Sequence, residues 1–477
     1  MWNLTQKQRR ILKDEQGHVI KEWGGKTSIA LVYPNTYGVG MGNLAVHSLY
    51  KILNDNKHIV CERAFLPDRK DLVEHKRTGT PVLSVETQRP LAEFGCVAFS
   101  ISFQNDFLNI MPILSLSSIP HLADQRNESH PLLIAGGCAV TINHLPLSEI
   151  FDALVIGEGE EVAGDIIRIL GEGLSRDETL NALSKIEGII VPKSGKTKTA
   201  RRFVKKLDDF PVQTVIHTAN AEFGDMHLIE TGRGCPRKCG FCVTPRLYEP
   251  LRMRSYDAIL KMVKDGLPYR KRFGLIGSDL LSHRAFVDIV NAIHDLGVTF
   301  SPSSLCVDEI DDEVAKLLAK SGHKSISLGV EAASDRLRSS VGKKFSSGRI
   351  LEAAESLARH GINSVRLYFM IGLPGETLED VKAIADLSKK VKSIIRKKVT
   401  LTVTPFVPKP LTPFENEQFA GEKYIKDAIK ILKKLLGKEK GIEIHADPVS
   451  SSVLDAELSK GHLHTISKLL ANPRSLT

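Results

Sequence analysis

Three cysteines in one short segment carry the strongest chemical signal in this sequence. Cys235, Cys239 and Cys242 lie within eight positions, in "TGRGCPRKCGFCVTPRLYEP" (231–250), although the 477-residue chain holds only seven cysteines. Four cysteines close a structural zinc or iron–sulfur site, whereas a catalytic metal keeps one coordination position open. Three thiolates at the spacing C-x-x-x-C-x-x-C therefore predict a 4Fe–4S cluster with one iron free to bind another molecule.

A zinc site is the alternative interpretation of these cysteines. Zinc would need a fourth ligand from elsewhere in the chain, for which the sequence offers His217 or His227. The spacing favours the cluster. So does the position directly after a predicted strand, where barrel enzymes carry their chemistry.

Composition and the placement of the cysteines limit the classes of protein to which this chain could belong. Hydrophobic residues make up 42% and charged residues 25%, which is ordinary for a globular protein with a large core. The sequence starts without an apolar run and holds no stretch of the roughly 20 apolar residues that a membrane span needs. The odd number of scattered cysteines predicts no disulfide framework. We therefore expect a cytoplasmic protein without a membrane span.

The formal charge of +9 raises the question of nucleic-acid binding. The densest basic run covers residues 193–206, and a second lies in residues 424–440. In the second run, isoleucines and leucines recur at helical spacing, so its lysines are expected on the exposed face of a helix. Neither run interleaves aromatic residues as a base-stacking surface would, and nucleic acid is not the expected partner.

The first half of the chain alternates strand-like apolar runs with helical patterns, which predicts a parallel α/β sheet. After an N-terminal extension (1–26), this domain is expected over residues 27–187. Ligands bind such sheets beyond the carboxyl ends of the strands, which here are rich in small residues. The strands are predicted at residues 28–34, 58–65, 96–102, 131–137 and 153–159.

The alternation restarts after a linker, expected at residues 188–224. Six β/α units over residues 225–440 are too few for a full eight-fold barrel, and they predict a partial (β/α)6 barrel. A C-terminal segment (441–477) follows. The barrel strands are predicted at residues 226–232, 273–278, 299–304, 325–331, 364–372 and 399–406.

The motif "CPRKCGFC", with Phe241 before its last cysteine, resembles the signature of the radical S-adenosylmethionine (radical SAM) enzymes. The resemblance covers residues 225 to about 415. It implies that the open iron of the cluster binds the amino and carboxylate groups of S-adenosylmethionine. An external flavodoxin- or ferredoxin-like donor would supply the electron that cleaves this cofactor to a 5′-deoxyadenosyl radical. Phe241 would lie near the adenine.

The resemblance also nominates residues around S-adenosylmethionine. The segment "LIGSD" (275–279) inexactly matches the turn that receives the methionine amine, "GVEAAS" (329–334) matches a strand whose acid meets the cofactor, and "RLYFMIGLPGET" (366–377) matches the adenine-side strand. The alternatives are that the glutamate of "GVEAAS" pairs with a barrel lysine and that "GLPGET" only opens a helix. The nominated residues are Gly277, Ser278, Asp279, Glu331, Arg366 and Gly372.

The N-terminal strands resemble the cobalamin-binding domain that precedes many radical SAM enzymes, and this likeness covers residues 27 to about 465. It implies a flavodoxin-like (Rossmann-like) parallel sheet before the barrel, with cobalamin at the strand ends. The alternative is a degenerate domain that only supports the barrel. The residues implied for cobalamin are Tyr37, Gly38, Ser102, Gly136, Gly137, Gly157, Glu158 and Gly159.

The lower face of the predicted cobalamin is unusual. Many cobalamin domains carry D-x-H-x-x-G after the first strand, and here the histidine position falls at or beside Gly38. Glycine has no ligand atom, and His47 is expected on a helix face. Tyr37 could cover this face, but a neutral phenol is a poor ligand for cobalt. We therefore expect cobalamin with no nitrogen ligand from the chain or from its own base.

The leading functional hypothesis is cobalamin-dependent methylation of an unactivated carbon. The alternatives are a radical rearrangement or cyclisation, an iron–sulfur protein that carries electrons or senses redox state, and a methylthiotransferase acting on tRNA. The last would need a second cysteine triad, whereas Cys61, Cys96 and Cys138 lie at predicted strand positions. Cys306 follows a predicted barrel strand and could reach the active site. The substrate is not identified by the sequence.

Overall fold

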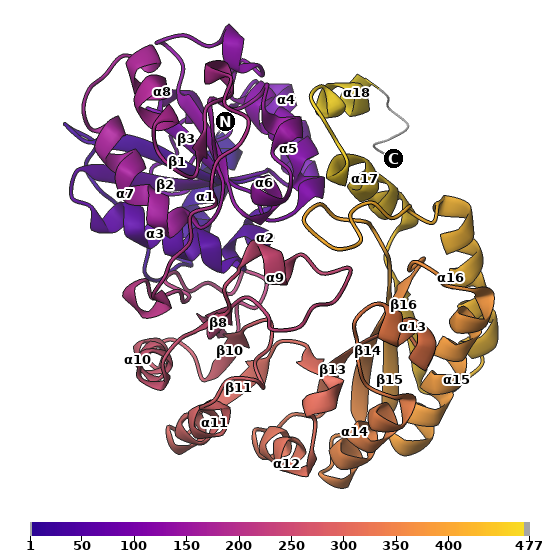
Figure 1. The fold of residues 1–477 in the computed structure, drawn as a ribbon. Helices are drawn as coiled ribbons and strands as arrows, with labels where there is room; N and C mark the ends of the chain where they lie inside the picture. Colours follow the sequence, from indigo (N-terminus) through magenta and orange to yellow (C-terminus); the bar gives the residue numbers. More distant parts are fainter. Residues whose placement is uncertain (1, 472–477) are drawn as a thin grey trace. The chain divides into compact units, whose positions relative to one another are not determined.

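The computed structural model describes residues 2–471 and divides the chain into two compact units (Figure 1). The first unit comprises the residues up to Leu228 together with those from Lys460 onward, and the second runs from Ile229 to Ser459. The expected linker therefore lies within the first unit. The expected C-terminal segment (441–477) is divided between the two units.

The first unit is built on a six-stranded sheet with the order β2-β1-β3-β4-β5-β6. The first five strands are parallel, in the order of a flavodoxin-like sheet, which confirms the predicted fold class. β6 comes from the expected linker and pairs antiparallel with β5. The strands are β1 (Thr27–Tyr33), β2 (Ile59–Phe65), β3 (Cys96–Ser100), β4 (Leu132–Gly136), β5 (Ala153–Val155) and β6 (Ile189–Ile190).

Helices cover both faces of this sheet (Figure 1). α3, α7 and α8 pack in sequence against one another, and α5 lies on the opposite face, where α18 packs against it. The helices are α1 (Trp2–Lys13), α2 (Tyr37–Met41), α3 (Leu44–Asp55), α4 (Arg69–Thr78), α5 (Phe107–Leu116), α6 (Cys138–Ile142), α7 (Gly159–Leu170), α8 (Arg176–Ser184) and α18 (Thr465–Ala471).

The N-terminal extension is anchored in the first unit by buried charges. Arg63, fully buried on β2, binds Glu15 and Glu86 at 2.7 Å each. Removing one member of such a network leaves an uncompensated buried charge, which is strongly destabilising. The extension is therefore part of this domain's core.

The basic run at residues 193–206 is partly neutralised within the first unit. Lys193 lies 2.8 Å from Asp177, and Arg202 lies 3.3 Å from Glu161. These ion pairs give the run a structural role beside the sheet.

The second unit contains the curved strands of the predicted partial barrel (Figure 1). One sheet has the order β11-β10-β7 and the other β12-β13-β14-β15-β16, and β8 pairs with β9 as a short ribbon. The strands are β7 (His227–Glu230), β8 (Gly232–Arg233), β9 (Arg252–Met253), β10 (Arg272–Ile276), β11 (Thr299–Pro302), β12 (Leu305–Cys306), β13 (Ser325–Glu331), β14 (Ser364–Ile371), β15 (Lys398–Pro405) and β16 (Ile442–Ala446).

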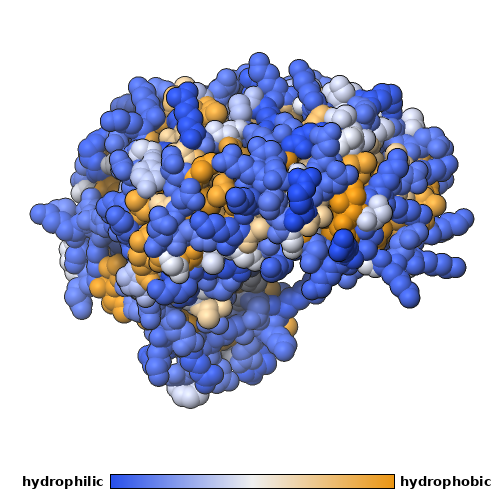
Figure 2. All heavy atoms as spheres, turned by 90° about the horizontal axis from the view of Figure 1, so that it is seen from below, coloured by the Kyte–Doolittle hydropathy of each residue, from blue (hydrophilic) through white to orange (hydrophobic). Residues whose placement is uncertain are grey.

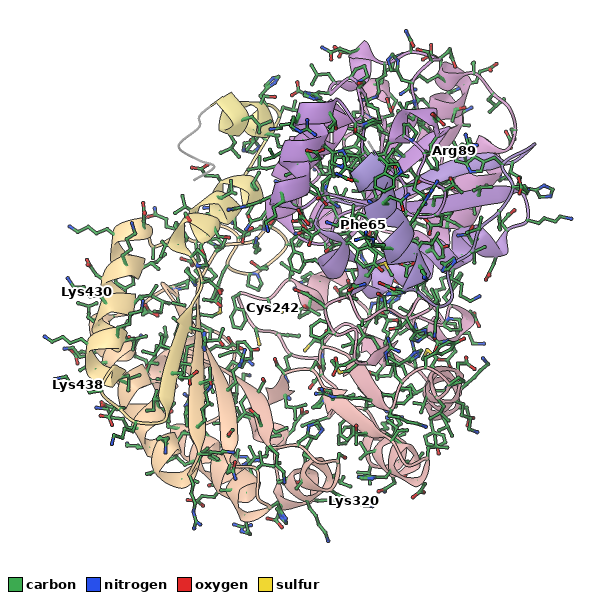
Figure 3. All side chains as sticks on the ribbon, turned by 180° about the vertical axis from the view of Figure 1, so that it is seen from behind. Phe65, Arg89, Cys242, Lys320, Lys430 and Lys438 are labelled. Carbon is green, nitrogen blue, oxygen red and sulfur yellow. The ribbon has the colours of Figure 1, made fainter. Side chains whose placement is uncertain are left out.

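Most of the longer helices of the second unit, α10, α11, α12, α14, α15 and α16, lie on the outer side of these strands (Figure 1). On α16, Ile425, Ile429 and Leu432 are buried, whereas Lys430 points outward (Figure 3), as the helical spacing predicted. The helices are α9 (Thr244–Leu247), α10 (Tyr256–Gly266), α11 (Phe286–Asp295), α12 (Asp312–Lys320), α13 (Asp335–Ser340), α14 (Ser347–Arg359), α15 (Leu378–Ile394), α16 (Glu422–Leu436) and α17 (Val449–Ser459).

Hydrophilic residues cover most of the face drawn in Figure 2, and the apolar residues form small scattered groups. Within residues 2–471, no helix combines the length and the apolar character that crossing a membrane requires.

Candidate functional site: the cysteine loop and the strand ends

The loop that carries the three cysteines follows β8 and is fixed by close packing (Figure 3, Cys242). The Gly240 N–H donates to the Val341 carbonyl at 3.0 Å, and the Phe414 N–H donates to the Gly240 carbonyl at 3.1 Å. A Cβ atom at Gly240 would lie 2.5 Å from the Phe414 ring. A side chain at this position, between the second and third cysteines, would therefore displace the Phe414 ring.

The thiols of this loop sit in a partly buried environment. Burial raises the pKa of Cys239 to about 11, against the opposing effect of the Lys343 ammonium, and burial also raises the pKa of Cys235. Cys242 lies close enough to act electrostatically on both Cys235 and Cys239. Because the thiolate is the form that binds metal, loading the loop with iron must release protons.

The geometry disfavours a single zinc ion at the three cysteines. Thiolates 2.3 Å from one zinc ion would lie within about 4 Å of each other. In the described chain, however, the ligand atoms of the three cysteines are not all within 4.8 Å of one another. The side chains that do meet this distance are those of Asp279, Cys306 and Glu309. His227 binds His217 and Gln213 through its two ring nitrogens, at 3.0 Å each. The wider spacing of the cysteines suits a multi-iron cluster.

Arg237, inside the cysteine motif, ties the loop to two neighbouring strand ends. Its guanidinium lies 2.7 Å from Asp308, 2.9 Å from Glu309 and 3.5 Å from Asp279. Asp279 follows β10, and the other two acids follow β12. Sequence reasoning missed this residue, although its place between Cys235 and Cys239 was a usable signal.

Asp279 presents a buried carboxylate with unused acceptors. Its side chain is 1% exposed, and neither carboxylate oxygen has a hydrogen-bond partner in the described structure. A buried acceptor without a donor is costly, so the site fits a ligand that brings a positively charged donor. Gly277 allows this turn, since a Cβ atom there would lie 2.5 Å from Thr231 Oγ1, whereas Ser278 is exposed.

Glu331 occupies a strained position at the end of β13. Its φ of 68° lies in the left-handed region, at an irregularity in the pairing with β14. Strained non-glycine residues of this kind concentrate at functional sites. The carboxylate lies 3.5 Å from Lys343, as the barrel-lysine alternative predicted, and burial raises its pKa despite that lysine. Its charge also acts on Cys239, so this pair borders the cysteine loop.

Phe241 lies near the segment that contains Gly372. Phe241 packs in a small apolar cluster that includes Ala332, next to Glu331, and Leu373, next to Gly372. Gly372 has a φ of 83° and donates its N–H to Glu376 Oε1 at 2.8 Å. The structure thus gathers these nominated residues at the carboxyl ends of the barrel strands.

Arg366 lies apart from this group. Glu331 pairs with Phe369 of β14, and Arg366 lies three residues before Phe369 on the same strand. At about 3.3 Å per residue, Arg366 lies roughly 10 Å toward the amino end of the strand. Its assignment to S-adenosylmethionine stays a prediction, and its position favours another ligand.

Cys306, at the end of β12, lies beside the acid cluster. Burial raises its pKa to about 12, and both Lys343 and Arg237 act on it electrostatically. The thiol therefore borders the candidate site.

Glu376 makes the stability of this region depend on pH. Burial raises the pKa of Glu376 to about 7, and its Oε1 accepts hydrogen bonds from the Gly372 N–H and, at 2.9 Å, the Tyr424 hydroxyl. Between the unfolded pKa of about 4.3 and this value, the native state keeps a proton that the unfolded state has lost. Stability is therefore fully present below about pH 4 and is lost as pH rises toward 7.

We expect Glu376→Gln to keep both acceptor contacts and to remove this dependence. The advantage of the variant in melting temperature over the wild type should be larger at pH 8 than at pH 5 by at least about 2 °C. Thermal unfolding of the cluster-free chain at both pH values measures the difference. Glu379→Gln, at an exposed residue paired with Lys382, is the matched control. A difference of equal size at both pH values would contradict the assignment.

The first unit has a polar edge where β1 and β3 lie side by side, the point at which the order of the strands reverses. Ser102 Oγ accepts from Asn43 at 2.9 Å, and the buried Tyr33 hydroxyl lies beside both residues. Asp106 Oδ2 is buried without a hydrogen-bond partner within residues 2–471, and burial raises the pKa of Asp106 to about 6. This edge fits a polar ligand.

Gly137 follows β4 at the same edge. Its φ is 112°, and a Cβ atom would lie 2.5 Å from the Ile101 carbonyl oxygen. Gly136, the last residue of β4, faces Val155, 3.2 Å from its Cβ position. Gly137 must be glycine because its backbone approaches the Ile101 carbonyl too closely for a side chain.

Three residues nominated for cobalamin also contact other parts of the chain. A Cβ atom at Gly157 would lie 2.1 Å from the Arg202 carbonyl oxygen, and Glu158 accepts from the Val204 N–H at 2.9 Å. The Cβ position of Gly159 lies 3.1 Å from Leu49 of α3. These contacts with the 188–224 segment and with α3 account for their residue types without a ligand.

Tyr37, Gly38 and His47 are also engaged within the first unit. The Tyr37 hydroxyl donates to Glu15 at 2.6 Å, and the Gly38 carbonyl accepts from Glu222 at 2.8 Å. With α1, these two residues line a cavity of about 510 Å³. His47 is buried, with Nε2 3.0 Å from the Met41 carbonyl oxygen and a pKa lowered by burial to about 4.

The cysteines of the first unit form no second triad among themselves. Cys61 and Cys96 lie on β2 and β3, and each is in register with Ile29 of β1. Two strand spacings separate them, about 9.6 Å. Both are buried, and within residues 2–471 the cysteines of this unit show no second cysteine triad of the methylthiotransferase type.

Comparison with known proteins identifies the family. The model of the radical SAM superfamily matches residues 229–388, and the model described as radical SAM proteins, N-terminal, matches residues 45–192. An uncharacterised protein of Methanocaldococcus jannaschii is 30% identical over 456 residues, which cover 94% of this chain and 92% of that protein. This chain belongs to the radical SAM superfamily. The resemblance seen in the cysteine motif is confirmed.

Two further matches bear on this radical SAM enzyme. An uncharacterised methyltransferase of Pyrococcus horikoshii is 25% identical over 297 residues, covering 57% of this chain and 61% of that protein. The structure of TsrM, a radical S-adenosylmethionine methyltransferase from Kitasatospora setae with cobalamin and a [4Fe-4S] cluster bound, superimposes with a TM-score of 0.59 at 14% identity. This match covers 94% of this chain and 99% of TsrM. It shows the shared fold of the radical SAM enzyme across both units.

Proposed function

We propose that this radical SAM enzyme uses cobalamin to methylate an unactivated carbon of its substrate. The main support is that the same chain contains two features. One is a barrel loop with three cysteines, and the other is a flavodoxin-like unit with a polar, glycine-lined edge at β1 and β3. The fold shared with cobalamin-bound TsrM and the methyltransferase relative of Pyrococcus horikoshii support it.

The residues of the barrel have distinct roles in this proposal. Cys235, Cys239 and Cys242 hold three irons, and Asp279 accepts the ammonium of S-adenosylmethionine on its unused oxygens. The apolar cluster around Phe241 excludes water beside the loop. When bound, the cluster supplies the electron that cleaves S-adenosylmethionine, and cobalamin supplies the methyl group. An external reductant must reload the cluster.

The first unit holds cobalamin in this proposal through Ser102 and Gly137 at the β1–β3 edge. Asp106 and the Tyr33 hydroxyl offer polar contacts to the corrin side chains there. The segments around Gly157 and Gly38 shape the surrounding scaffold.

Corrinoid retention tests the proposal. After anaerobic reconstitution with iron, sulfide and hydroxocobalamin, we expect the desalted wild type to keep about one corrinoid per chain. Ser102→Phe, which fills the polar edge, should lose the corrinoid and keep its iron. Gly164→Ala is the matched control, because its Cβ position on α7 has open space. A wild type that holds iron but no corrinoid would refute the role of cobalamin.

The electron paramagnetic resonance spectrum of the bound corrinoid provides a second test. His47 is buried, with Nε2 3.0 Å from the Met41 carbonyl oxygen and Nδ1 accepting from the Val215 N–H at 3.2 Å, and Gly38 has no side chain, so neither residue offers a nitrogen to cobalt. Electron paramagnetic resonance of the cob(II)alamin form should therefore lack superhyperfine splitting from an axial nitrogen. Such splitting would contradict the expected absence of a lower ligand.

A further inference from the structure

We infer that the inner face of the five-stranded sheet binds an oxyanion of the substrate through Arg366. The inner face is the side turned away from the outer helices. This inference rests on the proposed function and names the chemical class of the substrate, a molecule with a carboxylate or phosphate. The residues of the inner face used below are Ser327, Arg366, Tyr368, Thr400, Thr402 and His445.

Strand register and burial place these residues on one face. On β14, Val365, Leu367 and Phe369 are buried in the core that includes residues of α14, α15 and α16. Successive side chains of a strand point to opposite sides, so Arg366 and Tyr368 point inward. Figure 1 shows the helices outside this curved sheet.

Two rows cross the inner face. In the first row, Arg366 pairs in register with Ser327 on β13 and with Thr400 on β15. In the second row, one step nearer the carboxyl end, Thr402 pairs with Tyr368 and with His445 on β16. Each row therefore combines a cationic or titratable side chain with hydroxyl groups.

Arg366 is a cation without a partner in the described structure. Its side chain is exposed, and it makes neither a hydrogen bond nor an ion pair within residues 2–471. The same row continues from Thr400 to Glu443 on β16. This acid forms an ion pair with Lys398 at 2.7 Å, not with Arg366. A free guanidinium offers a fork of donors that matches carboxylate and phosphate geometry.

The second row supplies an unused hydroxyl. Thr402 Oγ1 is buried and has no hydrogen-bond partner in the described structure. A buried hydroxyl of this kind marks a position where water or a ligand completes the contacts. Thr402 and the half-buried Tyr368 lie between Arg366 and the carboxyl end of the strands, so they line the path from the anion toward the cysteine loop.

The spacing defines the substrate further. Three residues separate Arg366 from the row of Glu331, which is roughly 10 Å along the strand. Asp279 and Glu331 both lie at the carboxyl ends, with the cysteines. The backbone of Arg366 is therefore set back from the cofactor residues at the strand ends, and this position assigns the oxyanion on Arg366 to a second molecule, the substrate.

Arginine labelling tests the inference directly. Phenylglyoxal modifies free guanidinium groups, and peptide mass spectrometry reports the rate at each arginine of the cluster-loaded full chain. We expect inorganic phosphate or succinate to slow labelling of Arg366 about tenfold once the probe reaches roughly ten times its dissociation constant. Potassium chloride at equal ionic strength should not. Arg396, exposed and without a side-chain partner in the described structure, is the matched control.

Each outcome decides one question. Protection by phosphate alone or by succinate alone identifies the class of oxyanion. Unchanged labelling with both probes overturns the inference, and protection by S-adenosylmethionine alone overturns it by assigning Arg366 to the cofactor. Titration calorimetry of the protecting probe with Arg366→Gln should show lost binding. Cofactor cleavage, measured in the same preparation, reports separately on the proposed function.

Discussion

Alanine at Cys235, Cys239 or Cys242 will abolish the iron–sulfur cluster. Each thiolate holds a different iron, so a single loss leaves one iron without its cysteine ligand and the cluster unstable. Iron and sulfide content and the charge-transfer absorption of the reconstituted protein should both fall close to zero in each variant.

Two other cysteines serve as controls for this expectation. Cys61 is buried on β2 and Cys138 begins α6, both in the first unit. Cys61→Ala and Cys138→Ala should keep nearly the full iron content of the wild type. Equal loss of iron in all five variants would mean that the assignment of the cluster to the 235–242 loop is wrong.

Asparagine at Asp279 will weaken binding of S-adenosylmethionine while leaving the cluster in place. The substitution keeps the shape of the side chain but removes the negative charge from a buried acceptor that faces no donor except Arg237. A hydrogen bond to a charged group contributes about 1.5–3 kcal/mol, so the dissociation constant should rise about 10- to 150-fold. Equilibrium dialysis of the cluster-loaded protein measures it.

Asp308→Asn separates this role from the anchoring of the loop. Asp308 binds the same guanidinium, at 2.7 Å, but its side chain is 36% exposed. Its substitution should change cofactor affinity much less than Asp279→Asn. Equal effects of the two substitutions would show that Asp279 acts only by holding Arg237.

The sequence predicted the strands that are strongly apolar and bounded by helices. "SIALVYP" and "SVRLYFMIG" became β1 and β14 because their side chains are covered by helices on at least one face. β12 has two residues, too few for a pattern, and β16 alternates half-buried with exposed residues at a sheet edge. Such short or edge strands form through pairing with neighbours, which one sequence does not display.

The candidate site likewise contains residues that a local motif reveals and residues that only distant contacts reveal. The cysteines, Phe241, Asp279 and Glu331 could be nominated from the sequence because a local motif marks each of them. Lys343 was missed because its contact with Glu331 depends on a loop that returns after α13. The glycine and acid at positions 157 and 158 also contact a segment more than 40 residues later in the chain, which the local motif does not display. Contacts between distant segments decided these cases.

Cleavage of S-adenosylmethionine tests the central claim most directly. The reconstituted protein is incubated anaerobically with S-adenosylmethionine and dithionite, and 5′-deoxyadenosine is quantified by mass spectrometry. We predict that the wild type forms 5′-deoxyadenosine and that Cys239→Ala forms none. A wild type with a full cluster that leaves S-adenosylmethionine intact would contradict the account and would instead indicate an iron–sulfur protein that carries electrons or senses redox state.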